Sequence, residues 1–326
     1  MHGAVGQGEP SSPGLESGCA TVFQLLSDVK SGGKRGHDAV LALARKDTPE
    51  AGQALLDVAK GLHGQILQDW AITCLLKGTN APASARLLLS AEDARVVSRA
   101  LGALVGHPVD QALATSLGTF VAHEDYGIRN NALQVIRRAP SGLTGAQTCQ
   151  LVRDSLETSA KVTHGDHFLL VQDRVDGEFS RSGSLFRKAV AVLATSAVVD
   201  VEVLRSATPE SNGLPRDCFL MARACRGDRS VKTELLQVVR GSTSHEIRVV
   251  GLESLRPLLD NGDRTFLEGM ARTDPFGLWF PPSQLTQLET WRRWGISEGK
   301  FHPVRETAAR ILNTLGPAPP GGDEAR

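Results

Sequence analysis

Apolar residues recur at helical spacing along most of the chain, and residues 302–316 give the clearest example. Pro303 suits a first helical turn, where a missing N–H has little effect, and Gly316-Pro317 predicts the end of the helix. The apolar side chains between them are spaced to lie on one helical face. They are Val304, Ala308, Ile311, Leu312 and Leu315. A helix with one apolar face needs a partner to cover that face.

The same arrangement recurs along the chain as a small residue followed four positions later by an apolar residue. Five of the seven intervals between successive pairs are 29–33 residues long, and the other two are 57. Periods of about 20–50 residues, with two helices per unit, are typical of an α-solenoid. We therefore predict an all-α fold. The pairs are Ala39/Leu43, Ala71/Leu75, Ala100/Leu104, Ala132/Ile136, Ala189/Leu193, Cys218/Ala222, Gly251/Leu255 and Ala308/Leu312.

Three of the repeated helices begin in a similar way, with an aliphatic residue followed by arginine. These stretches are Ile128-Arg129 before Ala132, Ile247-Arg248 before Gly251, and Val304-Arg305 before Ala308. They resemble the second helix of HEAT-like repeats, and units near 30 residues are similar to the short subclass first described in phycobilin lyases. The resemblance implies a right-handed α-solenoid of about eight HEAT-like helix pairs. It implies no particular activity, because such arrays serve many unrelated roles.

The predicted array spans residues 19–316, between a disordered leader at 1–18 and a disordered tail at 317–326. Both termini are rich in Gly, Ser and Pro without periodicity. The two long intervals predict insertions near 161–184 and 274–300. For the first we expect a hairpin or an ordered loop, with a short extra helix as the alternative. If each insertion joins a first helix to its second helix, both leave the array from the same edge.

The insertion near 274–300 holds three of the four tryptophans, and its prolines predict a loop. One interpretation is that the aromatic residues cover the C-terminal end of the array, as caps do in solenoids. The alternative is an exposed surface that anchors a partner through aromatic and arginine side chains. The predicted partner-binding residues are Trp279, Phe280, Trp291, Arg292, Arg293 and Trp294.

Composition narrows the function classes without selecting one. The chain has 326 residues, a net charge of zero, 41% hydrophobic residues and 22% charged residues, which is typical of a soluble globular protein. The neutral charge gives no general attraction to nucleic acid or anionic lipid. Its five cysteines form no C-x-x-C pair, and no apolar run reaches 18 residues. We therefore expect a cytoplasmic protein without membrane attachment.

Two groups of residues suggest metal chemistry only weakly. His164, Asp166 and His167 have ligand-type side chains in one loop, but they match no standard metal motif. His123-Glu124 and His245-Glu246 precede predicted second helices, where HEAT-like deoxyhypusine hydroxylases hold a di-iron centre. That family needs four such pairs, and helix capping explains two pairs more simply. We predict no metal and no cofactor.

Clustered basic residues, mostly arginine, leave a nucleic-acid-binding alternative, because they could line a groove as in HEAT-like alkylpurine glycosylases. They are Arg137, Arg138, Arg187, Lys188, Arg216, Arg223, Arg226, Arg229, Arg292 and Arg293. No phosphate-binding loop or catalytic motif accompanies them. The favoured prediction is a non-enzymatic scaffold or adaptor that binds another protein through its concave surface or its insertion edge. A DNA-repair module and a metal-dependent enzyme are the alternatives, and the oligomeric state is left open.

Overall fold

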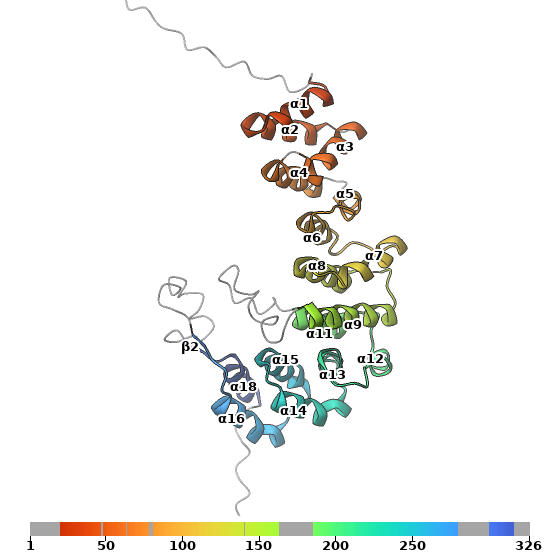
Figure 1. Ribbon diagram of the computed structural model, residues 1–326. Helices are drawn as coiled ribbons and strands as arrows, with labels where there is room; N and C mark the ends of the chain where they lie inside the picture. Colours follow the sequence, from red (N-terminus) through yellow and green to blue (C-terminus); the bar gives the residue numbers. More distant parts are fainter. Residues whose placement is uncertain are drawn as a thin grey trace, which may run out of the picture. The chain divides into compact units, whose positions relative to one another are not determined.

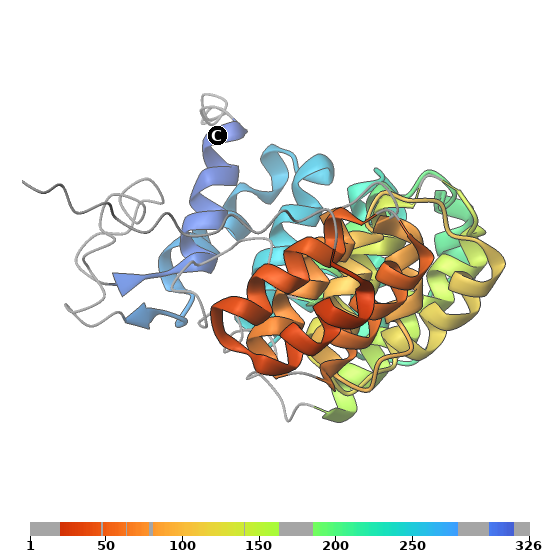
Figure 2. The ribbon, with the colours of Figure 1, turned by 90° about the horizontal axis from the view of Figure 1, so that it is seen from above.

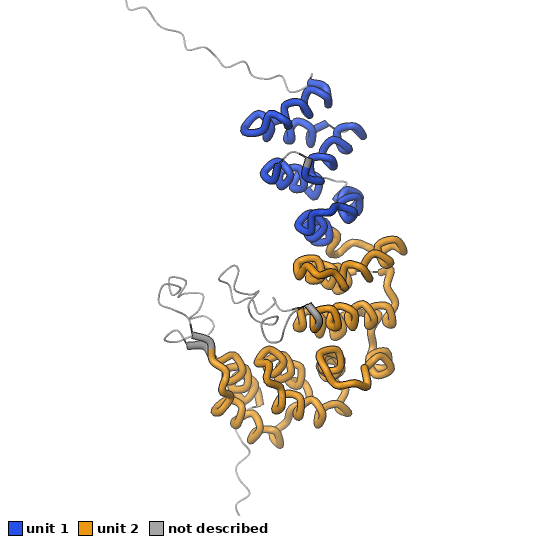
Figure 3. Tube along the Cα trace, viewed as in Figure 1, with its two compact units in different colours: residues 1–103 blue, residues 104–326 orange. Residues whose placement is uncertain are grey.

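The computed structural model describes residues 20–46, 48–62, 64–77, 81–139, 141–162, 185–279 and 300–315 (Figure 1). The described residues form helices joined by turns, with one pair of two-residue strands, and the all-α prediction is confirmed. The chain divides into two compact units, residues 1–103 and 104–326, and each is described by itself (Figure 3). The predicted leader, the predicted tail, most of both insertions and the metal candidates His164, Asp166 and His167 lie outside the described residues.

Unit 1 is built from three packed helix pairs. The helix α1 packs on α2, α3 on α4 and α5 on α6, while α2 contacts α4 and α4 contacts α6. A capping box at Thr21 starts α1, and Thr48 with Pro49 starts α3. The helices are α1 (Val22–Ser31), α2 (Gly33–Arg45), α3 (Pro49–Asp57) with the π-helical turn η1 (Val58–Leu62), α4 (Gln65–Lys77), α5 (Ala81–Leu88) and α6 (Ala94–Ala103).

Unit 2 repeats the same arrangement. Its α-helices are α7 (Gln111–Val121), α8 (Tyr126–Arg138), α9 (Gly145–Val162), α11 (Leu185–Thr195), α12 (Val201–Ala207), α13 (Leu214–Cys225), α14 (Lys232–Gly241), α15 (His245–Leu255), α16 (Arg264–Thr273) and α18 (Pro303–Thr314). The short elements are η3 (Arg229–Val231), η4 (Arg256–Leu258), η5 (Asn261–Asp263), β1 (Leu278–Trp279) and β2 (Lys300–Phe301). The packed pairs are α7/α8, α9/α11, α12/α13, α14/α15 and α16/α18.

The second members of these pairs form a continuous layer in unit 2. The helix α8 contacts α11, α11 contacts α13, α13 contacts α15, and α15 contacts α18. We call this set the second layer. The two long gaps in the description, 163–184 and 280–299, both fall between a first helix and its second helix. Figure 2 shows β1 and β2 beside the start of α18.

The small residues that defined the sequence period are buried in the second member of each pair. The alanines and Cys218 of the series are at most 3% exposed, from Ala39 in α2 to Ala308 in α18, and Gly251 is buried as well. Gly251 shows why size matters here, because a Cβ on it would lie 2.4 Å from a methyl group of Val239 in α14. Small residues therefore let the helices approach closely.

The apolar spacing predicts one helix over Asp38–Arg45 and another over Thr144–Ser159. In the structure α2 begins at Gly33, five residues before Asp38, directly after Gly32, whose φ of +70° separates it from α1. The helix α9 continues to Val162, beyond Ser159. The short helix α12 has no counterpart among the predicted helices. Among the described residues, no helix is long and apolar enough to span a membrane.

Candidate partner-binding surface

The two ends of the tryptophan-rich insertion are held together by β1 and β2. These strands pair antiparallel, with Leu278 opposite Phe301 and Trp279 opposite Lys300. Opposed residues in such a pair have Cα atoms about 5 Å apart. Residues 280–299 therefore leave and re-enter unit 2 at neighbouring positions. We call residues 274–279 and 300–302 the insertion base.

A buried aspartate fixes the first strand of the insertion base. The Asp274 carboxylate accepts a hydrogen bond from Arg248 Nη2 of α15 at 3.2 Å, and it forms an ion pair with the same guanidinium group, with 2.8 Å between Oδ2 and Nε. The same carboxylate accepts from the Phe276 backbone N–H at 3.1 Å. The Asp274 backbone carbonyl accepts from Arg305 Nε of α18 at 2.6 Å. One residue thus ties the loop after α16 to two helices of the second layer.

Two histidines, His302 of the insertion base and His245 of α15, contact Phe276. The His245 ring, which is buried, stacks on Phe276 with 3.7 Å between ring centroids. His302 Nδ1 lies 2.9 Å from the Phe276 carbonyl oxygen, and it must carry the proton because a carbonyl only accepts. A side chain at Gly277 would begin 2.6 Å from the His302 ring. The insertion base is therefore packed as closely as a protein core.

A set of charged side chains joins three helices of the second layer, and we call it the inner ion network. Arg187 of α11 pairs with Glu246 at 3.3 Å and with Glu253 at 2.9 Å, both on α15. Glu253 also pairs with Arg310 of α18 at 3.1 Å. The Arg187 pairs join α11 directly to α15, although α13 contacts both of these helices.

A small cavity adjoins the inner ion network. It has a volume of about 180 Å³ and is lined by Glu253, Arg256, Arg310 and Ile311. Two guanidinium groups and one carboxylate face it, so it suits a small polar or anionic group better than an apolar one. It lies against α18, the helix that follows the insertion base.

The arginine of the aliphatic–arginine motif has a structural role that the sequence did not reveal. Arg129, only 1% exposed, donates to the carbonyls of His123 and Glu124 at 2.6 and 2.7 Å. Arg248 donates likewise to the carbonyls of Ser242 and Thr243 at 2.7 and 3.1 Å. Both arginines satisfy the turn that precedes their own helix. In these two copies the motif therefore fixes helix–turn geometry, whereas Arg305 of the third copy donates to the Asp274 carbonyl in the insertion base.

Several arginines proposed for a nucleic-acid groove are engaged within unit 2. Arg216 donates to Glu234 at 2.6 Å, and Arg226 donates to the Ser196 carbonyl at 2.7 Å. Arg223 pairs with Asp228 at 2.8 Å. Arg138 and Arg229 are exposed, while Arg292 and Arg293 lie outside the described residues. A phosphate backbone would have to replace these internal partners.

The two His-Glu pairs lie in separate environments. His123 Nδ1 accepts from the Asp125 backbone N–H at 2.9 Å, at the start of α8. His245 stacks in the insertion base, and Glu246 belongs to the inner ion network. Within the described ranges, no group of three or more His, Cys, Asp or Glu side chains could hold a metal ion.

Two aspartates of unit 2 have pKa values displaced in opposite directions. Burial raises the pKa of Asp217 to about 6, against the opposing effect of Arg216. Burial also raises the pKa of Asp228, but hydrogen bonds from Ser230 and Arg223 outweigh it and bring the value to about 2. Asp228 is therefore ionised at neutral pH, whereas Asp217 titrates near the lower end of the physiological range.

Of the predicted partner-binding residues, the structure describes the backbone of Trp279, in β1. Phe280, Trp291, Arg292, Arg293 and Trp294 lie outside the described residues. The sequence reasoning missed Asp274, Phe276 and His302 as the residues that hold the insertion. A signal was present in the spacing, because Asp274 is the first residue of the predicted insertion and His302 lies two residues after its end. We find no match to this chain among protein-family models or among curated proteins.

Proposed function

We propose that this chain is a HEAT-like scaffold or adaptor that binds another protein, with the insertion base and residues 280–299 as its contact region. In this proposal the helix pairs of the two units are HEAT-like repeats, about eight in all, wound as a right-handed α-solenoid. The layered packing of pairs within each unit and the buried small residues support it.

The anchored insertion base is the observation that carries the proposal. Residues 280–299 contain Phe280, Trp291 and Trp294 together with Arg292 and Arg293. Aromatic and arginine side chains dominate the energetics of many protein interfaces. A segment whose two ends are fixed loses less conformational freedom when it binds. The inner ion network engages charged side chains of α11, α15 and α18 with one another, and this favours the insertion edge over these helices as the contact region.

Affinity capture from a lysate of the source cells tests the proposal. The bait is the full chain, and the test variant is the double substitution Trp291→Ala with Trp294→Ala. The matched control is Trp70→Ala, because Trp70 of α4 is 42% exposed and belongs to unit 1. We expect one protein that the wild type and the control capture and the test variant loses. Equal capture by all three baits would overturn the insertion edge as the contact region.

The two alternatives make different measurable claims. A nucleic-acid module would shift duplex or single-stranded DNA in a gel, and binding would fall steeply between about 50 and 200 mM salt. A metal-dependent enzyme would retain a transition metal after purification, which elemental analysis detects directly. The internal hydrogen bonds of Arg216, Arg223 and Arg226 favour protein binding over the nucleic-acid alternative.

A further inference from the structure

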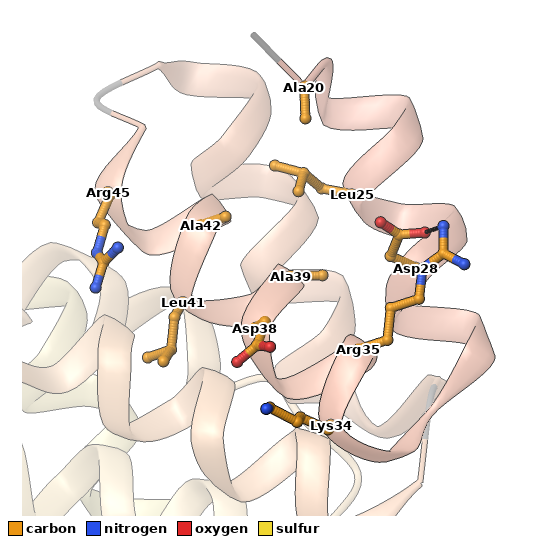
Figure 4. A pocket seen from close by; sticks show the side chains of 10 residues that line it. All are labelled: Ala20, Leu25, Asp28, Lys34, Arg35, Asp38, Ala39, Leu41, Ala42 and Arg45. Atoms are coloured by element: carbon orange, nitrogen blue, oxygen red, sulfur yellow. Dashed lines mark ion pairs between the residues drawn. The ribbon is translucent and has the colours of Figure 1, made fainter. Parts of the chain in front are cut away.

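A groove between α1 and α2 lies at the start of unit 1 (Figure 4). It has a volume of about 620 Å³, and its floor includes Leu25 and Ala39, which are buried. Its mostly apolar lining is bordered by charged side chains. The lining residues are Ala20, Leu25, Asp28, Lys34, Arg35, Asp38, Ala39, Leu41, Ala42 and Arg45. A groove of this composition fits another helix better than it fits a small polar ligand.

One stripe of side chains on α2 borders the groove, with an acidic residue at one end, two apolar residues in the middle and a basic residue at the other end. Asp38, Leu41, Ala42 and Arg45 follow one another at i, i+3, i+4 and i+7 along the helix. Residues at these spacings share a helical face, and the two charges are separated by about 10 Å. Asp38 and Arg45 are exposed, and Leu41 and Ala42 are half-buried between them. The stripe therefore carries one charge of each sign, placed symmetrically about an apolar centre.

This symmetry makes the stripe complementary to itself. When two copies of α2 lie antiparallel about a two-fold axis through the centre of the stripe, Asp38 of each copy faces Arg45 of the other. Leu41 then faces Ala42, whose small side chain allows close approach. A two-fold interface uses the same patch on both subunits, so a self-complementary patch is what such an interface requires.

The charged side chains at the rim of the groove include both acidic and basic residues, so they do not favour a purely acidic or a purely basic partner. Asp28 and Arg35 pair with each other at 2.7 Å, which neutralises the α1 side of the groove. Asp38 and Arg45 then offer one charge of each sign, with Lys34 at the rim. We propose that the groove binds the α2 helix of a second copy of this chain, giving a two-fold dimer through unit 1. This inference is independent of the proposed contact region in unit 2.

Sedimentation equilibrium of the full-length protein over a range of concentrations tests the dimer. We expect the wild type to dimerise reversibly. Asp38→Arg alone and Arg45→Asp alone each place like charges opposite one another, and each should weaken dimerisation at least about tenfold. The double variant Asp38→Arg with Arg45→Asp restores opposite charges in reversed positions. It should therefore return the dissociation constant to within about threefold of the wild-type value.

Two controls separate the interface from general effects on the protein. Lys77→Asp reverses an exposed charge on α4 outside the groove and should leave the dissociation constant unchanged. Far-ultraviolet circular dichroism should be the same for all variants, because the substituted side chains are exposed. A wild-type monomer at all concentrations would overturn the proposal, whatever else occupies the groove. A double variant as weak as the single variants would also overturn it.

Discussion

Replacement of Asp274 by asparagine should destabilise unit 2 strongly, because it leaves the charge of Arg248 buried without its partner. The two side chains are 3% and 8% exposed, and their closest contact is 2.8 Å. Breaking a buried ion pair by removing one partner costs about 3–5 kcal/mol in the free energy of unfolding. Asparagine keeps an acceptor oxygen for the Phe276 N–H, so the loss should come mainly from the missing charge opposite Arg248.

A surface ion pair in the same unit provides the matched control. Arg205 and Glu202 lie 2.7 Å apart, but their side chains are 48% and 77% exposed. Such pairs contribute less than about 1 kcal/mol, so Glu202→Gln should have little effect on the free energy of unfolding. Both substitutions remove one carboxylate charge from an arginine partner, but the first pair is buried and the second is exposed, and Arg205 also lies 3.5 Å from the Asp228 carboxylate.

Two measurements check the Asp274 prediction. Urea unfolding followed by circular dichroism should give a much lower midpoint for Asp274→Asn than for Glu202→Gln. Hydrogen exchange should show faster exchange of backbone amides in the insertion base of Asp274→Asn. The double variant Arg248→Met with Asp274→Asn should lose less stability than the two single losses added together. An Asp274→Asn midpoint no lower than that of Glu202→Gln would refute the role of this pair.

Three further predictions concern pH and packing in unit 2. The pKa of Asp217 is raised in the folded state, so its favourable contribution to stability is present below about pH 4 and is lost as the pH rises through 6. Relative to its effect at pH 4, Asp217→Asn should therefore raise the free energy of unfolding at pH 8 by about 2 kcal/mol. Urea titrations at the two pH values measure this difference. The pKa of Asp228 is lowered, so its contribution to stability is present above about pH 4 and is lost towards pH 2. Asp228→Asn should therefore lower the free energy of unfolding by about 2 kcal/mol at pH 7 and should leave it unchanged below pH 2. An equal loss at both pH values would contradict this. Gly251→Ala should lower the melting temperature through its contact with Val239, at a cost of about 1–3 kcal/mol, whereas Gly269→Ala, with no atom within 4 Å, should not lower it.

The sequence predicted the all-α fold because the signal of each helix is local. A small residue and an apolar residue four positions later determine which helical face is buried, and every small residue of the series is buried. The stretch from Leu185 to Lys188 looked irregular because it lacks the aliphatic–arginine start. In the structure, Phe186 occupies the position of the motif arginine, three residues before Ala189, and it is buried. The next residue, Arg187, pairs with Glu246.

Contacts between distant residues could not be predicted from the same pattern. Arg187 and Glu253 are 66 positions apart, and Arg248 and Asp274 are 26 apart. Whether such charges pair depends on how helices that are distant in the sequence pack against one another. The spacing of residues within one helix does not determine this. The insertion base was missed for the same reason, because Asp274, Phe276 and His302 meet only after α15, α16 and α18 have packed. Prolines and tryptophans signalled an irregular segment without showing what holds its ends.

Hydrogen exchange of the chain with its captured partner tests the proposed contact region most directly. The account predicts slower exchange on partner addition at residues 274–279 and 300–302 and in the segment between them, while unit 1 remains unchanged. Slower exchange confined to unit 1, or no change in the insertion base, would contradict the account.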